Sequence, residues 1–238
     1  YLEKDLALLR SSFDAFVHEG GYPEVVLEPS YVMKEKLLQG YFNAMVFRDL
    51  MDRYKLNNPE RVKYVIKRLM AGMTKPASIN AIYNDMRSQG RKVSKDDLYD
   101  IADKTCSIFL FYKVTKFDLS FKKETSALSK YYCVDNGLRQ SILLPGKDDE
   151  GILFENAVFL QLLRNLPEGH KICYYLGGKE CDFVIQSETA VKQLIQVCWD
   201  IKDKDTRERE LGGICEAADL TGCKDLIIVT RDSEEEVQ

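Results

Sequence analysis

The sequence lacks the marks of membrane, secreted and zinc-binding proteins. Its 238 residues contain no run of about 18 apolar residues and no signal peptide, so we expect no membrane span and a cytoplasmic location. Only two histidines are present, His18 and His170, and the seven cysteines form no CxxC pair. We therefore expect neither a zinc site nor a disulfide framework, and we expect the thiols to be reduced.

A P-loop is also missing. No G-x-x-x-x-G-K-[ST] motif occurs, so the chain is not expected to bind ATP in the P-loop manner. The sequence begins at Tyr1 rather than at Met, and we expect it to be a fragment of a longer protein. With 45% hydrophobic residues it can still bury a good core, and two or three small domains are expected.

The net charge of −4 is unevenly distributed along the chain. Residues 59–130 carry 15 Lys and Arg against 8 Asp and Glu, whereas residues 131–238 carry 12 against 21. Only the middle of the chain is therefore expected to be attracted to a polyanion such as DNA.

The apolar periodicity predicts an α/β protein in three parts, of which the first two are mainly helical. Residues 1–58 predict a helical adaptor, with helices over 1–18 and about 30–54. Residues 59–135 predict a winged helix-turn-helix domain. It has three helices followed by strands at 109–116 and 130–134. The three helices are expected to begin at Pro59 and after the capping residues Ser78 and Ser94.

The third part, residues 136–238, predicts a mixed sheet covered by helices. The pattern gives a helix over 151–166, strands over 171–176, 180–185 and 191–197, a polar helix over 206–220 and a strand over 225–230. We expect the apolar last strand to be buried and the acidic tail 233–238 to fray. Gly177-Gly178 is expected to form a turn between strands, and Gly212-Gly213 a point of close packing.

Several short stretches carry a resemblance to a known family. They are Gly20-Gly21-Tyr22-Pro23-Glu24, Arg48-Asp49, Lys130–Arg139, Phe154-Glu155-Asn156, Glu180–Val184, Ile195-Gln196-Val197 and Thr206–Glu210. In their order and spacing they resemble the prokaryotic AAA-type ATPases whose C-terminal half is a domain of unknown function.

The resemblance implies a missing N-terminal ATPase domain, which would bind ATP and Mg²⁺, whereas this chain would carry no cofactor of its own. It also implies that residues 1–58 belong to the end of the ATPase lid region. It further implies the winged helix and a C-terminal domain similar to PD-(D/E)XK nucleases.

A PD-(D/E)XK site needs carboxylates that hold Mg²⁺ and a lysine that acts on the attacking water. By resemblance, Glu155 matches the helix carboxylate and Asp182 the strand aspartate, and these two are the candidate metal ligands. Gln196 and Cys198 stand where the second strand acid and the lysine are expected. The basic side chains that could substitute for the lysine are Lys192, Lys204, Arg207 and Arg209.

Two interpretations of this degenerate site remain open. Either Glu155, Asp182 and Gln196 form a divalent-metal nuclease site, or the domain is inactive and serves as a scaffold or an interaction surface. In the second case Glu155 is expected either to act as a cap or to pair with Arg207 or Arg209, and Asp182 is expected to be a residue at the end of a strand.

The expected DNA contacts lie on the wing rather than on the third helix. The third helix carries Asp96, Asp97, Asp100 and Asp103 on the side away from its apolar stripe, which opposes contact with bases. The wing carries Lys113, Lys116, Lys122, Lys123 and Lys130. These lysines are expected to contact phosphates without sequence preference, or to form a solvated or docking face.

The sequence therefore predicts a regulatory or targeting portion of an AAA-type ATPase that is not catalytic on its own. Its expected partners are the missing ATPase domain and DNA or another protein, but no membrane. The alternatives are a divalent-metal-dependent nuclease and a protein-docking module of a signalling or toxin–antitoxin system.

Overall fold

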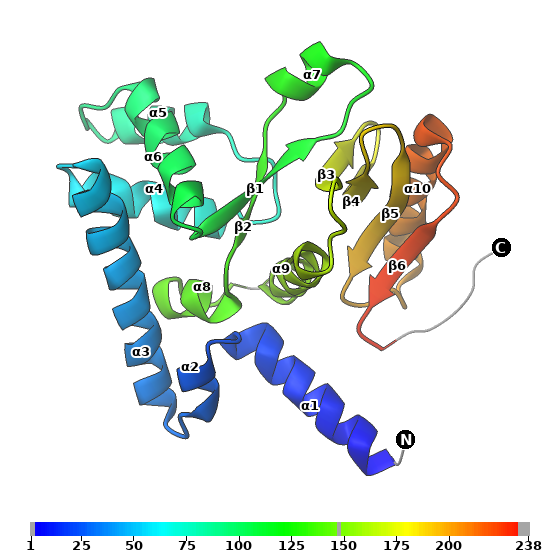
Figure 1. Ribbon diagram of the computed structural model, residues 1–238, viewed down its shortest axis with the longest axis horizontal. Helices are drawn as coiled ribbons and strands as arrows, with labels where there is room; N and C mark the ends of the chain where they lie inside the picture. Colours follow the sequence, from blue (N-terminus) through cyan, green and yellow to red (C-terminus); the bar gives the residue numbers. More distant parts are fainter. Residues whose placement is uncertain (1–2, 147–148, 233–238) are drawn as a thin grey trace. The chain divides into compact units, whose positions relative to one another are not determined.

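A computed structural model describes residues 3–146 and 149–232 (Figure 1). Among these residues the fold is α/β, with ten α-helices and a six-stranded sheet in the order β2-β1-β3-β4-β5-β6. The strands are β1 (Phe111–Lys116), β2 (Lys130–Cys133), β3 (Lys171–Leu176), β4 (Glu180–Gln186), β5 (Val191–Cys198) and β6 (Leu226–Thr230). The α/β class and the mixed sheet are confirmed, while the predicted fraying tail, 233–238, lies outside the described residues.

The chain divides into two compact units, and each is built from two segments. Unit 1 comprises Tyr1–Lys113 and Tyr131–Lys147, and unit 2 comprises Val114–Lys130 and Asp148–Gln238. The chain therefore enters unit 2, returns to unit 1 and enters unit 2 again. The three-part division at 1–58, 59–135 and 136–238 stays a prediction.

Unit 1 is mainly helical. Its helices are α1 (Glu3–Glu19), α2 (Pro23–Leu27), α3 (Tyr31–Ala44), the π-helical η1 (Met45–Asp52), α4 (Pro59–Ala71), α5 (Ile79–Ser88), α6 (Lys95–Ser107) and α8 (Asn136–Ile142). The predicted starts of α4, α5 and α6 are confirmed. The side chains of Asn58, Ser78 and Ser94 each accept a hydrogen bond from the backbone N–H three residues later.

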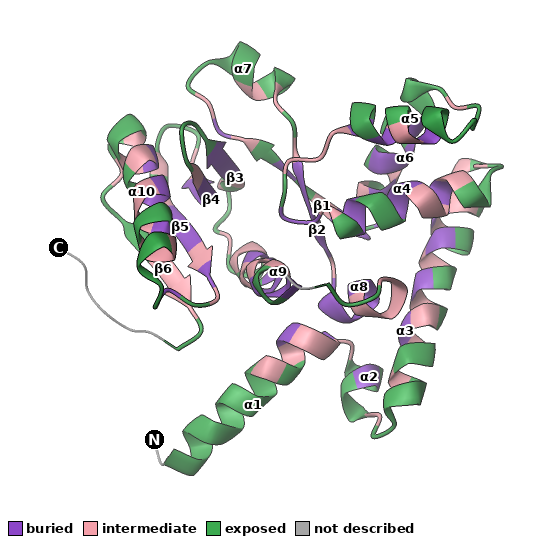
Figure 2. Cartoon of the chain, turned by 180° about the vertical axis from the view of Figure 1, so that it is seen from behind, coloured by how far each residue is buried: buried purple, intermediate pink, exposed green. Residues whose placement is uncertain are grey.

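The first helix forms as predicted, but most of its apolar side is exposed. Val17 in its last turn is buried, whereas Leu6 and Leu9 are 44% and 58% exposed. Figure 2 shows this exposed surface along α1. The apolar periodicity of α1 therefore gave the helix correctly but did not measure its burial.

Two glycine-containing segments of unit 1 meet at Asp135, the N-cap of α8. Its carboxylate accepts hydrogen bonds from the backbone N–H of Gly21 (2.7 Å) and of Leu138 (3.1 Å). A Cβ on Gly20 would lie 2.1 Å from the Asp135 carboxylate, and one on Gly137 would lie 2.1 Å from the Glu19 carbonyl oxygen. We call Gly20, Gly21, Asp135 and Gly137 the Asp135 corner. The lack of room for a Cβ at Gly20 and Gly137 explains why two of the family-like stretches contain these glycines.

Unit 2 holds the greater part of the sheet. Its helices are α7 (Phe121–Ser126), α9 (Asp149–Arg164) and α10 (Lys204–Thr221). The predicted order of helix, three strands, helix and strand is confirmed as α9-β3-β4-β5-α10-β6. Strand β4 is antiparallel to β3 and β5, whereas β6 is parallel to β5.

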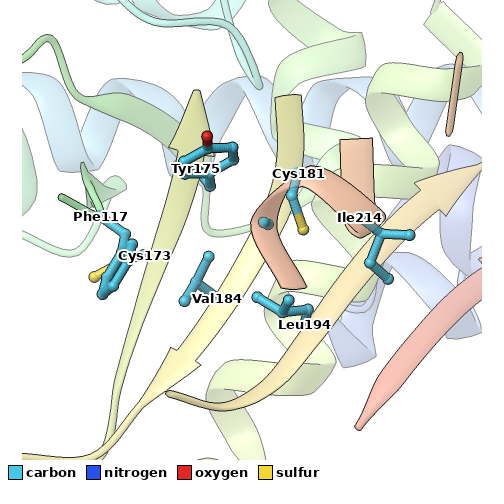
Figure 3. Close-up of a cluster of buried hydrophobic side chains, with 8 residues drawn as sticks. Phe117, Cys173, Tyr175, Cys181, Val184, Leu194 and Ile214 are labelled. Atoms are coloured by element: carbon cyan, nitrogen blue, oxygen red, sulfur yellow. The ribbon is translucent and has the colours of Figure 1, made fainter. Parts of the chain in front are cut away.

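Two helices cover the middle of this sheet. Figure 3 shows the cluster formed by Phe117, Cys173, Tyr175, Cys181, Val184, Leu194 and Ile214 together with Ala217. Ile214 and Ala217 come from α10, so α10 covers the face to which Val184 points. The neighbouring residue Phe183 contacts Phe159 of α9, with ring centroids 6.1 Å apart. Because successive strand residues point to opposite faces, α9 covers the other side.

The prediction that the last strand is buried is wrong. Leu226 and Ile227 of β6 are 41% and 40% exposed. The strand lies at the edge of the sheet, where β5 is its one strand neighbour, and α10 packs on β4 and β5. An apolar run was mistaken for a central strand because composition does not distinguish the centre of a sheet from its edge.

Close backbone packing fixes α10 against the start of β4. A Cβ on Gly213 would lie 1.9 Å from the Glu180 carbonyl oxygen, which confirms the predicted close contact. The turn at Gly177-Gly178 is also confirmed, and Glu216 of α10 accepts hydrogen bonds from the N–H groups of Gly178 (2.7 Å) and Lys179 (2.9 Å). These contacts place the N-terminal end of β4 beside α10.

Candidate functional site

A cleft of about 380 Å³ opens in unit 2 at this end of β4. It is lined by Glu155, Gly178, Lys179, Glu180, Asp182, Gln196, Val197, Arg209 and Glu210. Three residues that the sequence analysis singled out, Glu155, Asp182 and Gln196, therefore lie together, although they come from α9, β4 and β5.

Lys130 supplies a buried positive charge to these carboxylates. Its ammonium lies 2.6 Å from Glu180, 3.3 Å from Glu155 and 3.5 Å from Asp182, and the side chain is 1% exposed. We call Lys130, Glu155, Glu180 and Asp182 the Lys130 cluster. The ammonium also lies 5.3 Å from the ring centroid of Tyr174, a cation–π contact.

The Lys130 cluster keeps its ammonium charged. Burial by itself lowers the pKa of Lys130, but Glu155, Asp182 and Glu180 together raise that pKa above its ordinary value. Lys130 is therefore a permanent cation and not a general base at neutral pH.

Asp182 has an increased tendency to hold a proton. Burial and the nearby charge of Glu155 raise the pKa of Asp182 well above its ordinary value, although Lys130 and a hydrogen bond from the Val197 N–H (2.9 Å) oppose this. The ammonium, which Asp182 shares with Glu155 and Glu180, does not offset the cost of burying the Asp182 charge.

Gln196 takes part in a hydrogen-bond chain for which a carboxylate is not suited. Its side-chain oxygen accepts from the Asp182 N–H (3.1 Å), and its side-chain nitrogen donates to Glu210 (2.5 Å). Arg209 donates to the other Glu210 oxygen, at 2.6 and 3.0 Å. An amide can accept on one side and donate on the other, whereas an ionised carboxylate only accepts.

Cys198, at the expected lysine position, makes no ionic contact with this chain of groups. Its thiol is buried and donates to the Asp200 carbonyl oxygen (3.1 Å). Burial and the charge of Glu210 raise the pKa of Cys198, so the thiol stays protonated.

Three of the four expected substitutes for the lysine lie in different surroundings. Arg209 lines the cleft but is paired with Glu210. Lys204 pairs with Glu208 in its own helix, and Lys192 lines a separate pocket with His170. Glu155 pairs with Lys130 (3.3 Å).

The sequence analysis missed Lys130, Glu180 and Glu210 as members of the site. Lys130 was grouped with the exposed lysines of the wing, and this assignment is wrong because its side chain is 1% exposed. The one signal in the sequence was that Lys130 begins an apolar strand. In the structure all four residues of this strand, Lys130–Cys133, are buried.

The remaining wing lysines lie in different surroundings. Lys122 and Lys123 of α7 are exposed, and Lys116 is partly buried. In unit 1, Lys113 pairs with Asp103 (3.1 Å). The predicted orientation of the acidic side of α6 is confirmed, since Asp96, Asp97, Asp100 and Asp103 are all exposed.

Comparison with protein families identifies the larger part of the chain. The family model described as "Domain of unknown function (DUF8612)" matches residues 10–149, which is more than half of the sequence. The chain belongs to this family. The match covers the Asp135 corner and ends shortly before Glu155, so Lys130 is inside it and the other members of the Lys130 cluster follow it.

Two curated relatives are similar to this chain over most of its length. An uncharacterized protein of Methanocaldococcus jannaschii is 28% identical over 213 residues, which cover 89% of this chain and 47% of that protein. An uncharacterized protein of Haemophilus influenzae is 28% identical over 199 residues, which cover 82% of this chain and 48% of that protein. The chain thus spans about half the length of these relatives. No solved structure matches it.

The side chains of the cleft do not fit a divalent metal ion. Both expected ligands, Glu155 and Asp182, lie within 3.5 Å of the Lys130 ammonium. Within residues 3–146 and 149–232, no group of three or more His, Cys, Asp or Glu side chains is arranged to hold a metal ion. No step of a metal-dependent reaction is therefore assigned to these residues.

None of the helices in the described segments is both long and apolar enough to cross a bilayer.

Proposed function

We propose that this chain is the non-catalytic targeting portion of a prokaryotic AAA-type ATPase. In this proposal unit 2 carries a domain similar to PD-(D/E)XK nucleases, and α4, α5, α6, β1 and β2 correspond to a winged helix. The element order α9-β3-β4-β5-α10-β6 and the grouping of Glu155, Asp182 and Gln196 in one cleft support this proposal. The greater length of the relatives is compatible with a separate ATPase domain, to which ATP and Mg²⁺ would belong.

The observation that carries the non-catalytic assignment is the state of Gln196 and Cys198. Gln196 is a neutral amide that bridges the Asp182 backbone and Glu210, and Cys198 is a protonated thiol bonded to a carbonyl oxygen. Neither side chain supplies the second acid or the mobile cation that metal-dependent phosphodiester hydrolysis requires.

We propose further that α7 and its flanking loops provide the DNA contact. The helix has no buried residue, and its two lysines, Lys122 and Lys123, are exposed. Such lysines contact phosphates without reading bases, so binding is expected to be non-specific and to weaken steeply with salt. The exposed acids of α6 argue against base contacts by that helix.

The test is a fluorescence-anisotropy titration of the chain into labelled double-stranded DNA at about 50 and about 200 mM salt. Changing Lys122 and Lys123 together to Glu is expected to weaken binding at low salt by about tenfold or more. Changing Lys202 and Lys204 to Glu is the matched control. These lysines are 72% and 85% exposed in the same unit, and the net charge changes equally.

Three results would overturn parts of this proposal. Absence of binding at low salt would remove DNA as a partner and leave a protein-docking module. An equal loss in both double variants would remove α7 as the contact. Cleavage of the DNA with Mg²⁺ or Mn²⁺ present, abolished by Asp182→Asn, would replace the targeting role with a nuclease.

A further inference from the structure

Strand β6 lacks the features that usually keep an edge strand from pairing with another chain. Such strands commonly carry a charged side chain, a proline or a bulge. Residues Leu226–Thr230 contain neither a charge nor a proline, and they pair with β5 in a continuous register. Within the described residues β5 is the one strand beside β6 (Figure 1). Leu226 and Ile227, which point to opposite faces of the sheet, are both exposed, so apolar surface is uncovered on both faces at this edge.

Alternate residues of β6 direct their backbone polar groups away from β5. The Leu194 N–H of β5 donates to the Asp225 carbonyl oxygen (2.9 Å), so Asp225 presents its backbone groups to β5. Because this direction alternates along a strand, Ile227 also faces β5, whereas the N–H and C=O groups of Leu226 and Ile228 face the open edge. These groups form a row to which a further strand can bond.

The charges that flank β6 complement one another when two identical strands run in opposite directions. In an antiparallel pair centred on Ile228, Lys224 lies opposite Asp232 of the other copy, and Asp225 lies opposite its Arg231. All four side chains are exposed, and by symmetry each contact between opposite charges occurs twice. A parallel pair in register would instead place like charges side by side. The charge pattern therefore favours a second copy of this chain in the antiparallel direction.

The same register agrees with the direction of the backbone groups. Directly opposite residues of two antiparallel strands alternate between hydrogen-bonded and non-hydrogen-bonded pairs. Because the backbone groups of Ile228 face the open edge, Ile228 and Ile228 of the second copy can form a hydrogen-bonded pair, and Leu226 belongs to the next such pair. An arrangement centred on Ile227 meets neither condition, since its backbone groups face β5 and it brings no opposite charges together.

We propose that β6 is a dimerisation edge, which pairs antiparallel with β6 of a second copy about a two-fold axis between the two Ile228 residues. The sheet then continues from one copy to the other through β5-β6-β6-β5. Ile228 packs on the apolar cluster beneath α10, so the pairing extends this cluster across the edge. One short strand forms the contact, and we therefore expect a weak dimer that depends on concentration. The proposal goes beyond the targeting role, and its test does not involve DNA.

The first measurement is sedimentation velocity of the whole chain from about 2 to about 200 μM, over which the wild type is expected to shift from monomer towards dimer. Ile228→Lys places two lysines opposite each other at the centre of the contact and is expected to weaken the dimer at least about tenfold. Leu176→Lys changes an exposed leucine of β3 in the same unit and is expected to leave the dimer unchanged. A wild type that stays monomeric throughout would overturn the proposal, and so would an equal loss in both variants.

A charge exchange tests the register and decides the matter if Ile228→Lys does not fold. Lys224→Asp alone and Asp232→Lys alone each place like charges opposite each other, and each is expected to weaken self-association by about fivefold. An equimolar mixture of these two variants brings opposite charges together at both contacts and is expected to associate as tightly as the wild type. This outer pair is chosen because Asp225 and Arg231 also contact side chains of their own copy. A mixture that associates no better than either variant alone would overturn the proposal.

Discussion

Unit 1 and unit 2 each bury a carboxylate, but they satisfy its charge by different means. At the Asp135 corner the carboxylate accepts hydrogen bonds from the backbone N–H groups of Gly21 and Leu138. In the Lys130 cluster, Asp182 shares an ammonium with two other carboxylates. Backbone N–H groups keep their partial charge at any pH, whereas the charge on Asp182 depends on Lys130 and on the two neighbouring carboxylates. The first arrangement therefore depends on the local backbone, and the second on side chains from separate helices and strands.

The largest expected effect comes from removing the cation of unit 2. Lys130→Met leaves the buried Asp182 and the partly buried Glu155 and Glu180 without their ammonium, and it is expected to reduce the free energy of unfolding by about 3–5 kcal/mol. Trp199 packs edge-on against Phe154 in unit 2, so urea unfolding followed by its fluorescence measures the change. Lys171→Met is the control, since the exposed Lys171–Glu124 pair is expected to contribute less than about 1 kcal/mol. Equal losses in both variants would contradict the comparison.

The next largest effect is expected at the Asp135 corner. Asp135→Ala leaves the Gly21 and Leu138 N–H groups without their carboxylate acceptor and is expected to reduce stability by about 2–3 kcal/mol. Asp135→Asn keeps one acceptor oxygen and should lose about half as much. Thermal unfolding followed by circular dichroism measures both changes. Equal losses in the two variants would show that the acceptor oxygens of Asp135 are not what stabilises this corner.

A smaller effect is expected when the nuclease-like acid is restored in unit 2. Gln196→Glu places a second carboxylate against Glu210 at the position of a 2.5 Å hydrogen bond, and we expect a loss of about 1–3 kcal/mol. Combining it with Glu210→Gln exchanges the donor and the acceptor and should recover most of this loss. The Trp199 fluorescence assay on the two single variants and the double variant gives the coupling free energy. If the stability losses of the two single variants simply add in the double variant, the Gln196–Glu210 hydrogen bond does not depend on having one donor and one acceptor.

The smallest effect is a difference in pH dependence. Because the folded protein raises the pKa of Asp182, its protonation favours folding, and this stabilisation is lost as pH rises from the ordinary carboxyl range through the folded pKa. Asp182→Asn removes the titration but can still accept from the Val197 N–H. Relative to this variant, the wild type is expected to lose about 1 kcal/mol or less between acidic and neutral pH. If the wild type instead gains stability over this range, the effect of Lys130 on the pKa of Asp182 outweighs the effects of burial and Glu155.

Local features of the fold were predictable from the sequence because their causes are local. The caps at Ser78 and Ser94 depend on a hydroxyl and a backbone N–H three residues away, and the structure confirms both. The order of strands and helices in unit 2 followed from apolar periodicity in the same way. The exposure of β6 could not be predicted from periodicity, because it depends on which strands and helices become neighbours of β6.

Only part of the candidate site could be predicted from the sequence, because its remaining members are brought together by the fold. Glu155, Asp182 and Gln196 were identified because short stretches around them resemble a known family. Lys130 reaches Glu155 across 25 residues, and nothing in the intervening sequence links the two. The sequence alone does not distinguish a buried lysine from an exposed one. The role of Lys130 could therefore be identified only from the three-dimensional structure.

The alternation of the chain between the two units has a consequence for synthesis on the ribosome. Unit 1 is completed only when Tyr131–Lys147 has been made, and by then Val114–Lys130 has already been made for unit 2. At that stage Lys130 has no contact with Glu155 or Asp182, and Phe117 has no contact with Cys173, because these partners are synthesised later. A nascent or truncated chain that stops after α8 would present Phe117 without its core and Lys130 without its counter-charges. Such a chain is expected to be held by chaperones or to aggregate, although every residue of unit 1 is present.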